Sequence, residues 1–316
     1  MSGKSTRREF VRNSALAVTG MVSTAHSLPA QANRPASMGA RFRQLLQRPE
    51  PFYCIAAFDG PSARLIELAG FESIFMGGSV NALDKGLPDW GLTNTSDLVE
   101  FAARYAGNVN IPVMADGDNG GGSPLTVYRF TQAFERAGLG AVMYEDRIRL
   151  ERIGQKPAVV STQHMVDQIR AAVDARTDMA IVARSDSQAA GLSVNEVIER
   201  GVAYAEAGAD AVSLVGVTRI EDIRRAANAI PKPLFSQMVH DSPPSRAKEA
   251  GFHVYFYTSM MQDIALAAYN KALMELKSTG MVARTFEATR LPREITAQLE
   301  RSQDILDRAA KYNVNR

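Results

Sequence analysis

Two carboxylates separated by one residue follow an apolar stretch in the segment ADGDNGGG. Asp116 and Asp118 come directly after the run IPVMA, in which Ala115 is the last apolar residue, and three consecutive glycines follow Asn119. Neighbouring carboxylates repel one another unless a proton or a cation lies between them, and glycines let a ligand approach the backbone closely. A divalent cation that holds a bound oxyanion is therefore the first chemistry that this segment predicts.

Further polar residues follow other short apolar runs of the chain. They are Gly77, Gly78 and Ser79 after SIFM, Asp89 in the loop LPDWG, Glu145 and Asp146 after AVMY, and Arg184, Ser185 and Asp186 in VARSD. Carboxylates are hard ligands for a cation, backbone N–H groups at a glycine pair can donate to an oxyanion, and a guanidinium can bind a carboxylate. Together these groups predict a site for a cation and a carboxylate substrate.

The elements that must position these residues alternate between strand type and helix type. Apolar runs of strand type begin at Tyr53, Ser73, Pro112, Ala141, Ala180, Ala211, Pro233 and His253. The stretches between them carry apolar residues at helical spacing and begin at Ser or Thr cap residues. This rhythm predicts an α/β fold, a (β/α)8 TIM-type barrel with its functional residues at the carboxyl ends of the strands. The alternative is an open doubly wound sheet, which is disfavoured because no GxGxxG motif follows the first strand.

The N-terminal segment has the features of an address signal. Twin arginines Arg7 and Arg8 are followed by Phe10, by a short apolar stretch over residues 15–22 and by small residues at a cleavage-type position. This pattern in residues 1–32 resembles a twin-arginine export signal and predicts a periplasmic or exported protein. The alternative is a basic tail on a cytoplasmic protein. The apolar stretch is too short for a permanent membrane anchor.

We expect four consecutive segments in the chain. They are the signal at 1–32, a linker with an N-terminal helix at 33–48, the barrel at 49–280 and a C-terminal helical extension at 281–316. The extension has a sparse apolar face that a barrel does not need.

Composition narrows the class of protein. The chain has 316 residues, of which 46% are hydrophobic, so it can bury a large core. The formal net charge is +2, and because residues 1–32 carry +3 the remainder is near neutral. A body without a basic stripe argues against nucleic acid as a partner. Cys54 is the only cysteine, which excludes an intramolecular disulfide and a cysteine-based zinc site.

Simpler interpretations of the acidic segment explain only part of it. An EF-hand loop that begins at Asp116 would place Gly120 and Val127 where oxygen ligands are required, so that interpretation fails. The glycines can also serve only to open the next helix, with Ser123 as its N-cap and Pro124 at its first position. That accounts for the glycines and leaves the two carboxylates unexplained.

The series GGS, LPDWG, DGDNGGG, YED and VARSD, in that order, resembles the isocitrate lyase and phosphoenolpyruvate mutase superfamily. The similarity extends from Arg41 to Gly280. Within that superfamily, the segments FDGPSARL, MGGSV and LVGV are most similar to the oxaloacetate decarboxylase branch. The resemblance implies a barrel that depends on Mg²⁺, with Mn²⁺ as a substitute, and that acts on a small 2-oxo or 2-hydroxy carboxylate through an enolate of pyruvate type. It also implies a homo-oligomer, a tetramer in which a C-terminal helix packs on a neighbouring subunit.

The resemblance also assigns roles by position. Asp116, Asp118 and Glu145 would be the metal ligands, Asp89 a catalytic residue on the metal or its waters, Arg184 a catalytic residue that binds the substrate carboxylate, and Gly77, Gly78 and Ser79 the groups that meet the enolate oxygen.

One departure from the superfamily decides between reactions. The carbon–carbon lyases carry KKCGH or KRCGH shortly after the E-D element, with the cysteine as general acid, whereas this chain has ERIGQ at residues 151–155. Ile153 cannot donate a proton. Decarboxylation of a 2-oxo diacid requires a polarised 2-oxo group and donors aimed at the developing enolate, and it requires no thiol.

Three functions follow from these observations, in decreasing order of support. The first is Mg²⁺-dependent decarboxylation of oxaloacetate or a related 2-oxo diacid through a metal-stabilised enolate. The second is a carbon–carbon lyase or hydrolase on a substituted malate or another 2-oxo acid with an acid other than cysteine. The third is a binding protein without turnover. The proton donor to the enolate stays open among water, Tyr257, Ser259 and His240.

Overall fold

A closed barrel of parallel strands forms the centre of the protein. The computed structural model describes residues 36–149, 154–237 and 244–314. Within these ranges eight strands close in the order β1-β10-β9-β8-β7-β4-β3-β2. They are β1 (Phe52–Ala57), β2 (Ile74–Met76), β3 (Val113–Asp116), β4 (Ala141–Glu145), β7 (Ala180–Ser185), β8 (Ala211–Leu214), β9 (Leu234–Gln237) and β10 (Val254–Tyr257). All eight predicted strands are confirmed, and the pairing of β1 with β10 excludes the open sheet.

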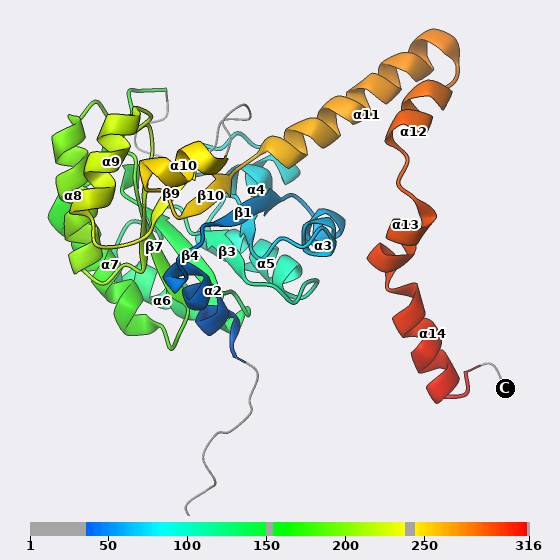
Figure 1. Cartoon of the computed structure of the whole chain (residues 1–316), viewed down its shortest axis with the longest axis horizontal. Helices are drawn as coiled ribbons and strands as arrows, with labels where there is room; N and C mark the ends of the chain where they lie inside the picture. The colour runs from blue at the N-terminus through cyan, green and yellow to red at the C-terminus, as the bar shows by residue number, and fades with distance from the viewer. Residues whose placement is uncertain (1–35, 150–153, 238–243, 315–316) are drawn as a thin grey trace, which may run out of the picture. The chain divides into compact units, whose positions relative to one another are not determined.

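Helices surround the barrel, and the chain's cap residues explain where they begin (Figure 1). They are α3 (Gly60–Leu68), α4 (Gly78–Asp84), α5 (Thr95–Ala106), α6 (Pro124–Arg136), α7 (Thr162–Ala175), α8 (Val194–Glu206), α9 (Ile220–Ala229), α10 (Pro244–Ala250) and α11 (Met260–Thr279). Asp59, Asn94, Ser123 and Ser193 each form a capping box at the start of a helix. These side chains satisfy N–H groups that the first helical turn leaves without partners, so local sequence fixes the helix starts.

The amino end of the barrel is closed by apolar packing. Helix α2 (Met38–Gln47) buries Phe42 and Leu46 against the barrel interior, which contains Phe75, Phe235 and Phe256. Burial of a side chain of this size contributes about 2 kcal/mol. Because α2 fills this end, a ligand has access to the barrel from the carboxyl end of the strands.

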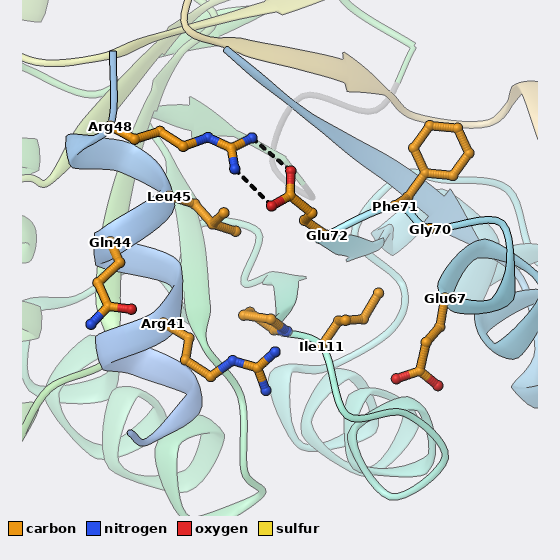
Figure 2. A pocket seen from close by; sticks show the side chains of 10 residues that line it. Arg41, Gln44, Leu45, Arg48, Glu67, Gly70, Phe71, Glu72 and Ile111 are labelled. Carbon is orange, nitrogen blue, oxygen red and sulfur yellow. Dashed lines mark hydrogen bonds and ion pairs between the residues drawn. The ribbon is translucent and has the colours of Figure 1, made fainter. Parts of the chain in front are cut away.

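A cavity of about 510 Å³ lies beside α2 at the same end (Figure 2). Each of its charged side chains has a partner, and those of Arg41 and Glu67 bond to the backbone of Asn110. Arg48, the residue after α2, donates to both carboxylate oxygens of Glu72, with distances of 2.7 and 2.6 Å. Glu72 precedes β2, so this ion pair ties the closing helix to the foot of the barrel. The cavity therefore offers no unmatched group for chemistry.

Helices follow the barrel at the C-terminus, as predicted. They are α12 (Ala283–Thr289), α13 (Arg293–Glu300) and α14 (Ser302–Lys311). Arg64 of α3 donates to the backbone oxygen of Gln298 in α13. Within the described residues α11 has no buried side chain, and it exposes apolar residues such as Ile264 and Tyr269.

Two further predictions concern the N-terminal signal and membrane-spanning helices. The export signal at 1–32 lies outside the described residues, and the four segment boundaries stay predictions. Among the helices that are described, each falls short of the length and apolar character that a membrane crossing requires.

Candidate active site

The predicted residues meet at the carboxyl ends of neighbouring strands. Asp116 is the last residue of β3 and Glu145 the last of β4. Strand pairing places Glu145 directly beside Arg184 of β7, with 3.4 Å between Oε2 and Nη1. Gly78 follows β2 and donates its backbone N–H to Asp116 Oδ2 over 3.2 Å. Parallel strands that end at one rim thus bring these distant parts of the chain together.

The acidic loop after β3 is held by its own backbone. Asp118 has φ +48°, an uncommon value for a residue with a side chain, and its N–H donates to Asp116 Oδ1 at 3.1 Å. The carbonyl of Asp118 accepts a bond of 2.9 Å from the N–H of Glu145. The loop therefore turns its two carboxylates back toward the end of β4.

Two glycines of this loop pack closely against side chains. A Cβ on Gly117 would lie 2.6 Å from the Tyr144 ring, and one on Gly120 would lie 2.4 Å from Val127. Packing against these side chains therefore requires a glycine at both positions. The glycine that faces the carboxylates is Gly78, where a Cβ would lie 3.2 Å from an oxygen of Asp116 and 3.2 Å from one of Asp118.

Arg149 contacts several of these carboxylates at once. Its Nε lies 2.5 Å from Glu145 Oε1 and its Nη2 lies 2.7 Å from Asp118 Oδ1. Its Nη1 lies 2.9 Å from Asp89 Oδ1, and this contact is what joins the predicted Asp89 to the site. The guanidinium side chain is only 5% exposed. The sequence did not predict this arginine as a site residue, although its position four residues after Glu145 was an available signal.

Arg184 is held by a carboxylate of its own strand end. Its Nε and Nη2 donate to the two oxygens of Asp186 at 2.8 and 2.9 Å. This bidentate pair fixes the guanidinium beside Glu145, at the rim where a substrate carboxylate is expected.

The side chain of Asp146 points away from the site and forms hydrogen bonds that hold the neighbouring strand end. It is fully buried and accepts bonds from the hydroxyls of Ser185 and Tyr204 and from the N–H of Asp186, each at 2.8 Å. Arg200 of α8 adds a fourth donor at 3.1 Å. Four donors to one buried carboxylate fix the end of β7, and with it the position of Arg184.

The carboxylates of the site differ in their electrostatics. Burial raises the pKa of Asp116, and burial together with the charge of Asp116 raises the pKa of Asp118 well above its usual range. Burial also acts on Glu145, but the guanidinium groups of Arg184 and Arg149 outweigh it and hold the pKa of Glu145 below its usual range. The positive charge near Asp116 and Asp118 therefore does not compensate for the burial of their ionised forms.

Two carboxylate oxygens of the site are buried without an aligned hydrogen-bond donor among the described residues. Asp118 Oδ1 and Glu145 Oε2 are buried and receive no aligned hydrogen bond from the residues that the structure describes, although each lies near a guanidinium nitrogen. Buried acceptors of this kind are rare, and carboxylate oxygens are the ligands that Mg²⁺ prefers. The donor set therefore fits a hard divalent cation in charge and type. Across residues 36–149, 154–237 and 244–314, no three acidic, imidazole or thiol groups are gathered closely enough to hold an ion as they stand.

The remaining candidates for proton transfer are placed only in part. Tyr257 at the end of β10 stacks on Tyr53, with ring centroids 6.2 Å apart, and Ser259 donates to Asp263 at 3.0 Å. His240 and residues 151–153 of the ERIGQ segment lie outside the described residues. The base of that segment is a short antiparallel pair of β5 (Arg147–Ile148) and β6 (Ala158–Val159), which the sequence did not predict.

Comparison with known proteins extends the resemblance found in the motifs. A family model described as phosphoenolpyruvate phosphomutase matches residues 42–277. The chain is 33% identical over 284 residues to an oxaloacetate decarboxylase of Pseudomonas savastanoi pv. phaseolicola, with 87% of this chain and 96% of that protein covered. It is 36% identical over 208 residues to a 2-methylisocitrate lyase of Shewanella oneidensis, with 64% and 70% covered.

A solved structure gives the same relationship in three dimensions. The crystal structure of a phosphonopyruvate hydrolase in complex with oxalate and Mg²⁺ matches with a TM-score of 0.79 and 25% identity, over 88% of this chain and 99% of that one. The match of the family model over most of the barrel and the identity to full-length relatives confirm the resemblance. The chain belongs to the phosphoenolpyruvate mutase and isocitrate lyase superfamily of enzymes.

Proposed function

We propose that the protein is a Mg²⁺-dependent decarboxylase of oxaloacetate or a closely related 2-oxo diacid, with Mn²⁺ as an alternative metal. The observation that carries the proposal is the group of buried carboxylates at one rim, Asp116, Asp118 and Glu145, in which burial raises the pKa of the two aspartates. The similarity to an oxaloacetate decarboxylase over nearly its whole length supports the substrate class. The absence of a cysteine from ERIGQ favours a reaction that needs no thiol acid.

The chain's own residues define the roles in this reaction. Asp116, Asp118 and Glu145 would hold the metal, which when bound supplies positive charge to the 2-oxo group. Arg184 would bind a substrate carboxylate, and Ser79 and its neighbouring amides would donate to the oxygen on which negative charge develops. The bond between C3 and C4 breaks, CO₂ leaves, and the electron pair forms the enolate of pyruvate. A proton from water at C3 then completes pyruvate.

A carbon–carbon lyase or hydrolase on a substituted malate or another 2-oxo acid is the second candidate. The observation that favours it is the 36% identity to a 2-methylisocitrate lyase. In that case a residue other than cysteine must supply the acid.

The test is release of pyruvate from oxaloacetate by the purified protein with Mg²⁺, measured above the rate that Mg²⁺ alone produces. Parallel assays with a 2-alkylmalate and with methylisocitrate separate the two candidates. We expect pyruvate release from oxaloacetate that stops after exhaustive chelation and returns with Mg²⁺. Efficient cleavage of methylisocitrate with oxaloacetate left intact would reject the decarboxylase in favour of the lyase.

Location and assembly are part of the same proposal. The twin arginines of residues 1–32 support export to the periplasm, and fusion of this segment to a reporter tests it. The apolar side chains that α11 exposes support assembly through the C-terminal helices, which we propose gives a homotetramer. A monomer at micromolar concentration in light scattering would contradict that assembly.

A further inference from the structure

One guanidinium in the site contacts carboxylates from three separate segments of the chain. Arg149 lies within 2.9 Å of Asp89 in the loop after α4, of Asp118 in the loop after β3 and of Glu145 at the end of β4. Each of its three nitrogens contacts a different carboxylate. The side chains of Arg149, Asp118 and Glu145 are almost fully buried, so the contacts to these two carboxylates are made away from bulk water, where the attraction between charges is strongest.

Two of these carboxylates are residues to which the proposed function assigns the metal. A Mg²⁺ ion would lie about 2.1 Å from its ligand oxygens. The guanidinium nitrogens already lie 2.7 Å from Asp118 Oδ1 and 2.5 Å from Glu145 Oε1. A guanidinium and a metal ion that both lie this close to the same carboxylates repel each other strongly in a buried site. The guanidinium therefore disfavours a divalent cation at these two carboxylates.

We infer that Arg149 is an internal counter-ion that competes with the divalent metal for Asp118 and Glu145, so that the metal binds only when this guanidinium withdraws. The inference rests on the metal site of the proposed function. Two observations support it. The described carboxylates are not gathered closely enough to hold an ion as they stand, and the oxygens Asp118 Oδ1 and Glu145 Oε2 lack an aligned donor even with the arginines in place.

The structure provides space into which Arg149 can withdraw. A cavity of about 410 Å³ lies beside it, between residues 91–95 and the loop from Asp118 to Gly122. Gly91, with φ +79°, lies so close that a Cβ would be 3.0 Å from the Arg149 Cβ. Asp89 is 44% exposed, so it can follow the guanidinium as its partner after the other two carboxylates turn to the metal.

The competition is tested by metal affinity in the absence of substrate. The full chain is stripped with chelator, and Mn²⁺ binding is followed by the loss of the free-ion signal in electron paramagnetic resonance. We expect Arg149→Gln to bind Mn²⁺ at least about tenfold more tightly than the unmodified protein, because tenfold corresponds to about 1.4 kcal/mol of relieved competition. Equal or weaker binding by Arg149→Gln would overturn the inference, since it would mean that the guanidinium helps to hold the metal.

Arg147 offers a matched control for the general effect of a nearby positive charge. It lies two residues earlier in β5, and its charge acts on Glu145 more weakly than those of Arg184 and Arg149. We expect Arg147→Gln to change the Mn²⁺ affinity by less than about threefold, a fraction of the tenfold effect at Arg149. An equal increase in both variants would attribute the effect to net charge and overturn direct competition.

A second variant covers the case in which Arg149→Gln fails to fold without metal. Arg149→Lys keeps the positive charge but replaces the three-nitrogen fork by a single ammonium, which cannot reach three carboxylates at once. We expect its Mn²⁺ affinity to lie between those of the unmodified protein and Arg149→Gln, and we expect saturating Mn²⁺ to raise its Tm by more than it raises that of the unmodified protein. Affinity and Tm shift no greater than those of the unmodified protein would overturn the inference.

These measurements separate this inference from the proposed function. A tenfold difference in Mn²⁺ affinity without pyruvate release from oxaloacetate rejects the decarboxylase and supports the role of Arg149. Pyruvate release from oxaloacetate, with equal Mn²⁺ affinities of the unmodified protein and Arg149→Gln, supports the decarboxylase and rejects the role of Arg149.

Discussion

At the amino end of the barrel Arg48 and Glu72 form a bidentate ion pair, whereas at the carboxyl end the arginines near Asp116 and Asp118 do not offset the burial of these carboxylates. The hydrogen bond from Arg48 lowers the pKa of Glu72, while burial raises that of Asp118. A charge that serves the fold is matched by its neighbour. A buried carboxylate whose ionised form lowers the stability of the fold indicates a ligand that binds it. This contrast distinguishes the functional end of the barrel from the closed end.

The largest effect should come from removing a carboxylate at the carboxyl end. We expect Asp116→Ala and Asp118→Ala each to reduce turnover of oxaloacetate by at least about 10³-fold, a loss comparable with that of other charge-stabilising groups in active sites. The free energy of unfolding without metal should change by no more than about 1 kcal/mol, because the lost contacts are offset by relief of a poorly solvated charge. Turnover assays and urea denaturation measure the two effects. Glu72→Ala at the other end is the control and should keep full turnover.

Asp146 tests whether the carboxyl end also contains charge that serves only the fold. Its carboxylate accepts four bonds in full burial, among them those from Ser185 and Arg200. We expect Asp146→Ala to reduce the free energy of unfolding by about 3–5 kcal/mol, because it leaves Arg200 buried without this partner. Urea denaturation measures the loss, with Asp167→Ala, at a side chain that is 48% exposed, as the control. An unchanged midpoint would mean that the four-donor network is not required for stability.

The pH dependence of stability should differ between the two ends. A carboxyl group whose pKa is raised on folding binds more protons folded than unfolded, so its contribution to stability is complete below its unfolded pKa and is lost as the pH rises through its folded pKa. Asp118 has such a raised pKa. For chelated protein we expect the free energy of unfolding to fall as pH rises through that window, by at most about 1.4 kcal/mol per pH unit for one proton. Asp118→Asn should reduce this decline, to which Asp116 also contributes, and denaturation at a series of pH values measures it.

Glu72 should show the opposite sign. Its pKa is lowered by the bond from Arg48, so its contribution to stability is present above its unfolded pKa and is lost as the pH falls through the folded one. A decline toward acid that is smaller in Glu72→Gln, beside a decline toward neutral pH that is smaller in Asp118→Asn, would establish the contrast in one set of measurements. The same sign at both positions would contradict it.

Local chemistry explains which features the sequence could predict. The strands are apolar runs of four to six residues in most cases, and capping side chains such as Ser123 and Ser193 fix the helix starts within a few residues, so the barrel followed from neighbouring positions alone. The convergence of Asp116, Glu145 and Arg184 followed from the rule that parallel strands end at one rim.

Features that depend on how side chains pack could not be predicted in this way. Asp146 differs from Glu145 by one position, yet alternation along the strand turns it away from the rim into the layer beneath α8. The glycines Gly117 and Gly120 are required by Tyr144 and Val127, which are distant enough in the chain that only the fold brings them into contact. The reach of Arg149 to three carboxylates likewise depends on the path of three loops.

The smallest effect is expected at the amino end, from the Arg48–Glu72 pair. Their side chains are 29% and 49% exposed, so water screens the attraction and the pair also loses side-chain freedom. We expect a double-mutant cycle of Arg48→Gln and Glu72→Gln to give a coupling energy of about 0.5–1 kcal/mol, at the upper end for an exposed pair because the contact is bidentate. Urea denaturation of the four proteins measures it, and turnover of oxaloacetate should be the same in all of them. A coupling energy of several kcal/mol, or a loss of turnover in either single variant, would mean that the amino end is linked to the site and that the matched pair does more than join α2 to the barrel.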